Sequence, residues 1–360
     1  MRVTKNLALA LALLLGCGSN TIAPPADSGS DAKPSGDASA DAMGDAADAA
    51  DAAPVVPRYA IDLSSTSVSG LSSGGFMAVQ FHLAFSSIMK GAAVFAGGPY
   101  MCSQGSVTKA LTTCAQGSPA PDVQACVAAA NQNFQAGSID DPAALATQKV
   151  FLFSGADDVV VAPAVVDALQ SFYAAFVPSA SIQYVNRRPA TSHTWPTLDY
   201  GAPCDAVQSP YVGKCTYDGA GLALAQIYGT LAPRVAAPTG AIVPIPQGAF
   251  IADPGSHSLD DTAYAYVPAS CSGGETCKVH VSFHGCLQGA SLVGDAFYAH
   301  VGLNEWADAN HVIVLYPQVM KSGTNPEGCW DFWGYDSPDF AKKTGPQMAM
   351  VRAMIDGLKK

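Results

Sequence analysis

The sequence predicts a single-domain α/β fold with a doubly wound, mostly parallel sheet, and three observations support it. Segments with the continuous apolar character of buried parallel strands alternate with segments of helical periodicity. A Gly-x-Ser-x-Gly sequence, residues 70–74, lies between a β-prone segment and an apolar helix. An aspartate and a histidine then follow later predicted strands, in the order Ser, Asp, His. Because the carboxyl ends of parallel strands share one edge of a sheet, we expect these side chains to meet there.

The individual elements follow from the spacing of apolar residues. Strands are expected at residues 66–70, 90–97, 149–153, 181–185, 263–267, 278–283 and 312–316. Helices are expected at residues 75–83, 162–176, 219–231 and 346–358. A Pro- and Ala-rich joint at residues 232–246 separates the first group of elements from the second. Residues 58–360 are therefore expected to form the folded domain.

Two segments with other compositions precede this domain. Residues 1–17 begin with positive charges and continue with a short apolar run, which is typical of a secretory signal and too short to span a bilayer. The run ends at Cys17 in a sequence resembling the bacterial lipobox, so we expect a lipid anchor there; a chance cysteine in an ordinary secreted protein is the alternative. Residues 18–57 are rich in Ala, Asp, Ser and Pro, which predicts a disordered tether.

Charge and cysteine usage exclude several classes of protein. The formal net charge is −11 and no basic stripe is present, so a nucleic-acid partner is not expected. The 10 cysteines of an exported protein indicate disulfides, and zinc-site spacing is absent, so neither a metal nor another cofactor is expected. We expect a monomer that contacts the membrane only through its lipid anchor.

Ser72, at the centre of the Gly-x-Ser-x-Gly sequence, is the candidate nucleophile and requires a base and an acid. His193, in the loop after the fourth predicted strand, is the candidate base, and His257 in a Gly/Ser loop is the best alternative. Asp157 and Asp158 both follow the third predicted strand, and the sequence leaves open which one turns inward. The other candidate bases lie within a helix, within a strand, or without an acid in the required order: His82, His280, His300 and His311.

The oxyanion hole of an α/β-hydrolase needs two backbone N–H donors. One belongs to the residue after the nucleophile, Ser73, and the other to a loop that follows an earlier strand and is often marked His-Gly. No such strand precedes Ser72, but His284 and Gly285 directly follow the strand predicted at residues 278–283. The sequence therefore predicts a circularly permuted α/β-hydrolase.

Several motifs resemble those of the poly(3-hydroxybutyrate) depolymerases, above all the circularly permuted, single-domain fungal enzyme and bacterial enzymes with a lipase box near the amino terminus. These motifs are residues 69–75, 95–100, 192–194, 217–221, 284–288, 306–308, 315–318 and 328–331. The resemblance implies Ser72 as nucleophile, Asp158 as acid and His193 as base. It also implies the N–H groups of Ser73 and Cys286 as oxyanion donors.

The resemblance further implies a serine esterase that acts on a polyester or oligoester through an acyl-enzyme. Four aromatic residues are expected around the substrate cleft: Trp195, Trp330, Phe332 and Trp333. Phe332 is a departure, because the fungal relative has tryptophan there, which bears on substrate fit. Two other functions stay open: a feruloyl or acetylxylan esterase, which would share the motifs in unpermuted order, and a catalytically silent surface lipoprotein.

We expect four disulfides in the domain. The resemblance implies Cys286–Cys329, which would pin the oxyanion loop. Three local pairs are expected beside it: Cys102–Cys114, Cys204–Cys215 and Cys271–Cys277. Cys126 would then be free, although Cys102–Cys126 stays an alternative because spacing does not determine connectivity.

Overall fold

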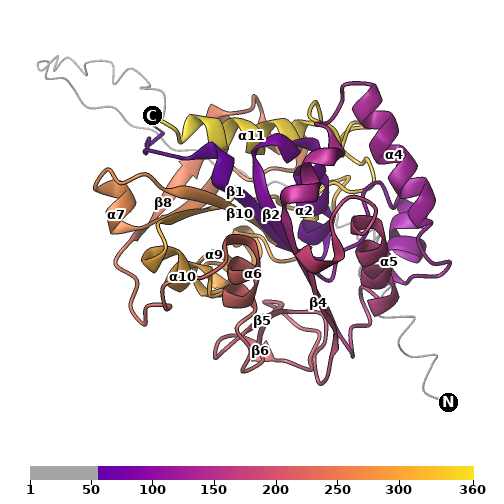
Figure 1. Cartoon of the computed structure of the whole chain (residues 1–360), viewed down its shortest axis with the longest axis horizontal. Helices are drawn as coiled ribbons and strands as arrows, with labels where there is room; N and C mark the ends of the chain where they lie inside the picture. The colour runs from indigo at the N-terminus through magenta and orange to yellow at the C-terminus, as the bar shows by residue number, and fades with distance from the viewer. Residues whose placement is uncertain (1–55) are drawn as a thin grey trace, which may run out of the picture.

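The computed structural model describes residues 56–360 (Figure 1). The predicted signal, the lipid anchor on Cys17 and almost all of the predicted tether at 18–57 lie outside the described residues. Val56 already packs against the hydrophobic core, so the folded part includes the last residues assigned to the tether.

One eight-stranded sheet forms the centre of the molecule, with the strand order β4-β3-β2-β1-β10-β11-β9-β8. Its strands are β1 (Thr66–Leu71), β2 (Met89–Phe95), β3 (Lys149–Gly155), β4 (Ile182–Arg188), β8 (Ala241–Pro246), β9 (Thr262–Val267), β10 (Lys278–Phe283) and β11 (Val312–Tyr316). All neighbours from β4 to β11 are parallel, whereas β9 and β8 are added antiparallel at one edge. The predicted α/β fold is confirmed. The joint expected at residues 232–246 was wrong in part, because it contains β8.

The permutation is visible in two places. β1, the first strand of the chain, pairs directly with β10, so that Ser69 lies opposite Ser282. The two ends of the described chain also meet, because the Tyr59 N–H donates to the Leu358 carbonyl at 2.7 Å and the Lys360 N–H donates to the Tyr59 carbonyl at 2.9 Å. Both features agree with the circular permutation predicted from the order of the motifs.

Helices cover both faces of the sheet (Figure 1). Alternate strand residues point to opposite faces. In β2, for example, Val94 joins the core under helices α2 (Ser73–Ala84), α5 (Pro163–Tyr173) and α11 (Pro346–Gly357). Phe95 instead joins the core under α6 (Gly219–Tyr228) and α10 (Leu303–Ala309). This burial on both faces explains the continuous apolar runs in the sequence.

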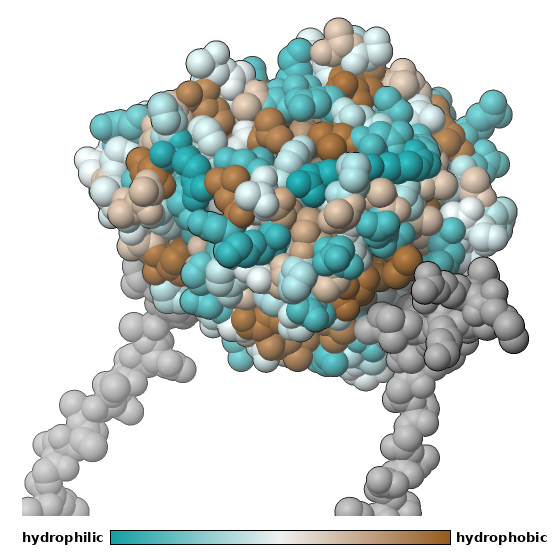
Figure 2. All heavy atoms as spheres, turned by 90° about the horizontal axis from the view of Figure 1, so that it is seen from below, coloured by the Kyte–Doolittle hydropathy of each residue, from teal (hydrophilic) through white to brown (hydrophobic). Residues whose placement is uncertain are grey.

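The remaining elements complete the domain. They are α3 (Val107–Lys109), the π-helix η3 (Ala110–Ala115), α4 (Val123–Gln135), α7 (Ala269–Ser272), α8 (Ala290–Val293), α9 (Ala296–His300) and a small sheet of β5 (Trp195–Thr197), β6 (Ala202–Pro203) and β7 (Val212–Lys214). The 3₁₀ turns are η1 (Leu63–Ser65), η2 (Ser86–Ile88), η4 (Pro142–Thr147), η5 (Ser179–Ser181), η6 (Gln247–Ala249) and η7 (Pro254–His257). The face seen in Figure 2 is a mosaic of hydrophilic and hydrophobic side chains. Within residues 56–360, no helix is both long and apolar enough to cross a membrane.

Candidate active site

Ser72 occupies a strained turn between β1 and α2. Its backbone has φ 58° and ψ −125°, a conformation that residues other than glycine adopt rarely and mainly at functional sites. Gly74 allows the start of α2 to approach β10, since a Cβ on this residue would lie 2.2 Å from the Phe283 carbonyl oxygen. The turn therefore has the strand–turn–helix geometry of a nucleophile elbow, with Ser72 at the carboxyl edge of the sheet.

His193 and Asp158 form a buried pair. The His193 Nδ1–H donates to Asp158 Oδ2 at 2.8 Å, and only 6% and 1% of the two side chains are exposed. The other carboxylate oxygen of Asp158 accepts the N–H groups of Val160 and Val161, both at 2.9 Å. Asp157, the adjacent candidate, is exposed. The pair therefore fixes the histidine tautomer that leaves Nε2 able to accept a proton.

The loop that carries His193 is braced by one of the disulfides. The Ser192 N–H donates to the carbonyl of Cys204 at 2.9 Å, and Cys204 is bonded to Cys215. The Arg188 guanidinium donates to the Cys215 carbonyl at 2.9 Å and stacks over the Tyr217 ring at 4.7 Å. These contacts fix the position of the histidine relative to β4.

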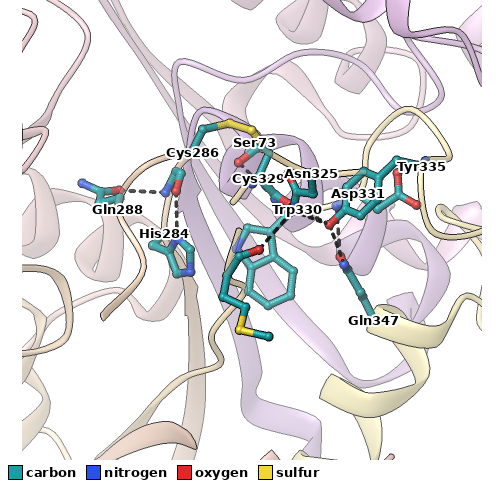
Figure 3. Close-up of a disulfide and its surroundings, with 12 residues drawn as sticks. Ser73, His284, Cys286, Gln288, Asn325, Cys329, Trp330, Asp331, Tyr335 and Gln347 are labelled. Carbon is teal, nitrogen blue, oxygen red and sulfur yellow. Dashed lines mark hydrogen bonds between the residues drawn. A yellow bond between two sulfur atoms is a disulfide. The ribbon is translucent and has the colours of Figure 1, made fainter. Parts of the chain in front are cut away.

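Hydrogen bonds orient the peptide between Gly285 and Cys286 (Figure 3). The buried His284 ring donates from Nδ1 to the Gly285 carbonyl at 2.7 Å, while its Nε2 accepts the Val319 N–H at 3.2 Å. The Gly285 N–H donates to Gln288 at 2.7 Å. In a trans peptide the N–H points away from the preceding carbonyl, so the Cys286 N–H is turned away from His284.

The cleft brings the predicted groups together. A cavity of about 220 Å³ is lined by Ser72, His193 and Cys286. A Cβ on Gly285 would lie 3.3 Å from the Ser72 Cβ, which shows how closely the predicted oxyanion loop approaches the turn at Ser72. No hydrogen bond joins Ser72 to His193 among the described residues; such contacts often tighten only when substrate binds. The remaining walls are mostly apolar and include Leu111, Val160, Val207 and Leu287.

The aromatic residues expected around the cleft are placed differently. Trp195 and Trp330 are fully buried, so the prediction that they line the cleft was wrong. Trp195 donates to the Val301 carbonyl within the core, and Trp330 packs against Phe283. Phe332 and Trp333 are half-buried, and neither lines the cavity.

The segment that carries Phe332 and Trp333 is organised by the buried Asp331 (Figure 3). Its carboxylate accepts backbone N–H groups from five residues, which are Trp333, Gly334, Tyr335, Asp336 and Ser337. Burial nevertheless raises the pKa of Asp331. Phe332 stacks on Phe76 of α2 with ring centroids 4.4 Å apart, so the segment is fixed against the elbow helix.

The structure contains disulfides between Cys102 and Cys114, Cys204 and Cys215, Cys271 and Cys277, and Cys286 and Cys329. The last joins the oxyanion loop to the segment before Trp330, whose N–H donates to the Ser73 hydroxyl at 3.3 Å (Figure 3). Cys126 is a buried free thiol, and burial raises its pKa to about 12. Within residues 56–360, no group of three or more His, Cys, Asp or Glu side chains is arranged to hold a metal.

The alternative bases have other environments. His82 is buried against Tyr173 and Gln148, and burial lowers its pKa to about 4. His280 is buried between the hydroxyls of two serines in β1. His257 pairs with Asp336 at 2.8 Å, but it does not line the cleft.

Comparison with known proteins gives the family. No protein-family model matches the chain. A poly(3-hydroxybutyrate) depolymerase from Delftia acidovorans is 44% identical over 306 residues, covering 84% of this chain. A polyhydroxybutyrate depolymerase from Talaromyces funiculosus is 38% identical over 322 residues, covering 84% of this chain and 92% of the relative. The chain belongs to the poly(3-hydroxybutyrate) depolymerase family.

Solved structures of depolymerases in this family share its fold. A serine-to-alanine variant of a PHB depolymerase, complexed with an R3HB trimer, has a TM-score of 0.79 at 34% identity, covering 85% of this chain and 98% of the other. The PHB depolymerase from Penicillium funiculosum has a TM-score of 0.77 at 34% identity, covering 85% and 100%. The chain spans only 61% of the length of the Delftia depolymerase.

Three cleft residues of this depolymerase-family chain were not singled out from the sequence. Gln288 links the oxyanion loop to the opposite wall by donating to the carbonyls of Pro210 and Tyr211, both at 3.0 Å. Tyr211 and Glu327 line the same cavity. Gln288 lies within the family motif at residues 284–288, so the sequence could have indicated a role for it. Tyr211 and Glu327 lie in loops that contain no family motif.

Proposed function

We propose that this protein is a serine esterase that hydrolyses ester bonds of poly(3-hydroxybutyrate) or a related polyhydroxyalkanoate. The observation that carries the proposal is the buried His193–Asp158 pair, which shares a cleft with Ser72 on its elbow. An aspartate-oriented histidine beside an elbow serine is the arrangement that activates a hydroxyl for acyl transfer.

Each group has a defined part in this reaction. The His193 Nε2 accepts the Ser72 proton as the hydroxyl attacks the ester carbonyl, and Asp158 stabilises the resulting imidazolium. The N–H groups of Ser73 and Cys286 stabilise the oxyanion. His193 then returns the proton to the departing alcohol, which leaves an acyl-enzyme on Ser72. Attack by water, assisted by the same histidine, releases the acid and restores the serine.

Two observations support a polyester as the substrate. The related PHB depolymerase solved with an R3HB trimer shares this fold over 85% of the present chain. The mostly apolar cleft walls suit a neutral chain of alternating ester and alkyl groups, which carries no charge to be solvated.

The deciding experiment compares clearance of a turbid poly(3-hydroxybutyrate) suspension with release of ferulate or acetate from the corresponding carbohydrate esters. We expect clearance by the wild type, and clearance by Ser72→Ala that is slower by roughly 10³-fold or more. Ser73→Ala should retain activity, because the Ser73 hydroxyl contacts the Trp330 N–H while its own backbone supplies the oxyanion donor. Faster release of ferulate or acetate would favour the carbohydrate-esterase alternative, and no turnover of any ester would favour a silent binding protein.

We further propose that the protein is exported and held at the cell envelope by lipidation of Cys17. The four disulfides support export, because such bonds persist in oxidising compartments. Metabolic labelling with a fatty acid should mark the wild type, whereas Cys17→Ala should be unlabelled and recovered in the medium. Labelling that persists in Cys17→Ala would contradict this assignment.

A further inference from the structure

Glu327 is an acidic residue in a cleft whose walls are otherwise mostly apolar. It lines the same cavity as Ser72 and Cys286. Its backbone carbonyl accepts the N–H of Leu287 at 2.7 Å, and it lies two residues before Cys329, which is bonded to Cys286. A backbone hydrogen bond to Leu287 and the nearby Cys286–Cys329 disulfide therefore hold the backbone of Glu327 beside the oxyanion loop.

The carboxylate of Glu327 has no ion-pair partner among residues 56–360. Lys321 is nevertheless close enough to lower its pKa. Burial has the larger effect and raises the pKa of Glu327. The negative charge of Glu327 also affects Tyr211, which lines the same cavity. Burial raises the pKa of Tyr211 most, and the charge of Glu327 raises it further.

An unpaired negative charge at this point affects reactant and product differently. The ester substrate is neutral, and the oxyanion of the transition state forms together with the His193 imidazolium, so the net charge of the reacting groups stays zero. Hydrolysis of the acyl-enzyme then gives a carboxylic acid, which loses its proton to solvent at pH 8 and leaves a carboxylate in the oxyanion hole beside a neutral histidine. Repulsion from Glu327 consequently raises the free energy of the bound product more than that of the transition state.

We propose that Glu327 is a specificity-determining residue that excludes carboxylates from the cleft, both as the acid end of an oligoester and as the hydrolysis product. The oligoester part of this inference rests on the proposed polyester function. An oligoester has one acid end and one alcohol end, and Glu327 disfavours placing the acid end beside the oxyanion loop. It also speeds departure of the acid released by each turnover.

The test uses two forms of the 3-hydroxybutyrate dimer at pH 8, the free acid and its methyl ester. We expect the wild type to prefer the methyl ester, and Glu327→Gln to reduce the ratio of the two kcat/KM values by about tenfold. Glu327→Asp keeps the charge and should keep the ratio. Glu275→Gln removes the same charge at an exposed position that does not line the cavity, and it should behave as the wild type.

A second measurement is independent of polyester cleavage. The anion 3-hydroxybutyrate and its neutral amide are compared as inhibitors of p-nitrophenyl butyrate hydrolysis. The anion should bind about tenfold more tightly to Glu327→Gln than to the wild type, with no change for the amide. If neither dimer is cleaved but the anion behaves in this way, the polyester function is wrong and the role of Glu327 stands. If the dimers are cleaved and neither ratio changes in Glu327→Gln, the role of Glu327 is overturned.

Discussion

The hydrogen bond from His284 to the Gly285 carbonyl fixes the direction of the Cys286 N–H. Two substitutions separate the contacts of this ring. In His284→Asn the side-chain amide can still donate to the Gly285 carbonyl, whereas in His284→Gln it reaches toward the Val319 N–H instead. We expect His284→Gln to lose roughly 10- to 100-fold in kcat with little change in KM, and His284→Asn to lose less than about tenfold.

A tetrahedral inhibitor distinguishes this orienting role from a general loss of packing. A trifluoromethyl ketone adds to Ser72 and places an oxyanion beside the Cys286 N–H, so its affinity should fall in parallel with kcat/KM. A neutral ester analogue that cannot add to the serine should bind both variants equally. Equal weakening of both compounds would show that His284 only supports the fold.

The proposed acid of the triad, Asp158, allows a matched comparison with the adjacent Asp157. Asp158→Asn should lower kcat by roughly 10⁴-fold, because an amide stabilises the wrong histidine tautomer. Asp157→Asn should stay within about twofold of the wild type, because this exposed carboxylate has no contact with His193. Steady-state kinetics on p-nitrophenyl butyrate are sufficient for this test. Similar losses in both variants would place the acid elsewhere.

These residues also show what a sequence can and cannot reveal. The order Ser, Asp, His along the chain pointed to Ser72 and His193, which the structure brings to one cleft. Choosing Asp158 over Asp157 required knowing which carboxylate turns inward, and the sequence of two consecutive aspartates does not reveal this. Trp195 and Trp330 were misplaced for a related reason, since an aromatic side chain suits a cleft wall and a core equally well.

At the scale of elements, the predictions succeeded where burial is uniform. β10 and β11 have the predicted bounds because both of their faces are covered, which produces an unbroken apolar run. β8 was missed because it contains Pro244 and Pro246, and proline is tolerated in strands mainly at an edge, where β8 lies. The small sheet of β5 to β7 was missed because its strands are too short to show an alternation of apolar and polar residues.

The Cys204–Cys215 disulfide, which braces the loop that carries His193, should matter more for activity than a disulfide remote from that loop. The Cys204→Ser, Cys215→Ser double variant frees the backbone that Ser192 and Arg188 contact, so we expect kcat to fall by about tenfold or more. The control is Cys271→Ser, Cys277→Ser, which opens another local bridge outside the cleft, with a sequence separation of 6 against 11 for Cys204–Cys215. Both should lose about 2–4 kcal/mol of unfolding free energy, measured by denaturant titration. Equal kcat in the two double variants would contradict the bracing role.

At the scale of the whole molecule, the proposed nucleophile and the proposed oxyanion loop belong to different halves of the chain. β1 and β10 nevertheless lie side by side in the sheet, and the described ends are joined by backbone hydrogen bonds at Tyr59. The architecture therefore depends on which strands are neighbours and not on where the chain is cut. This independence explains why motif order alone predicted the permutation.

A chain cut at the natural joint should consequently fold and work. We propose joining Lys360 to Val56 through a short Gly/Ser linker and opening the chain between Ala236 and Ala237, in an exposed connection ahead of β8. No strand pairing crosses that connection, so the melting temperature should fall by only a few degrees and p-nitrophenyl butyrate turnover should stay within about threefold of the wild type. A control opened between Val281 and Ser282 interrupts β10, which pairs with both β1 and β11, and it should not fold. If the rearranged chain opened at Ala236 were as unstable as this control, the order of synthesis or folding, and not strand adjacency alone, would be required to assemble the active site.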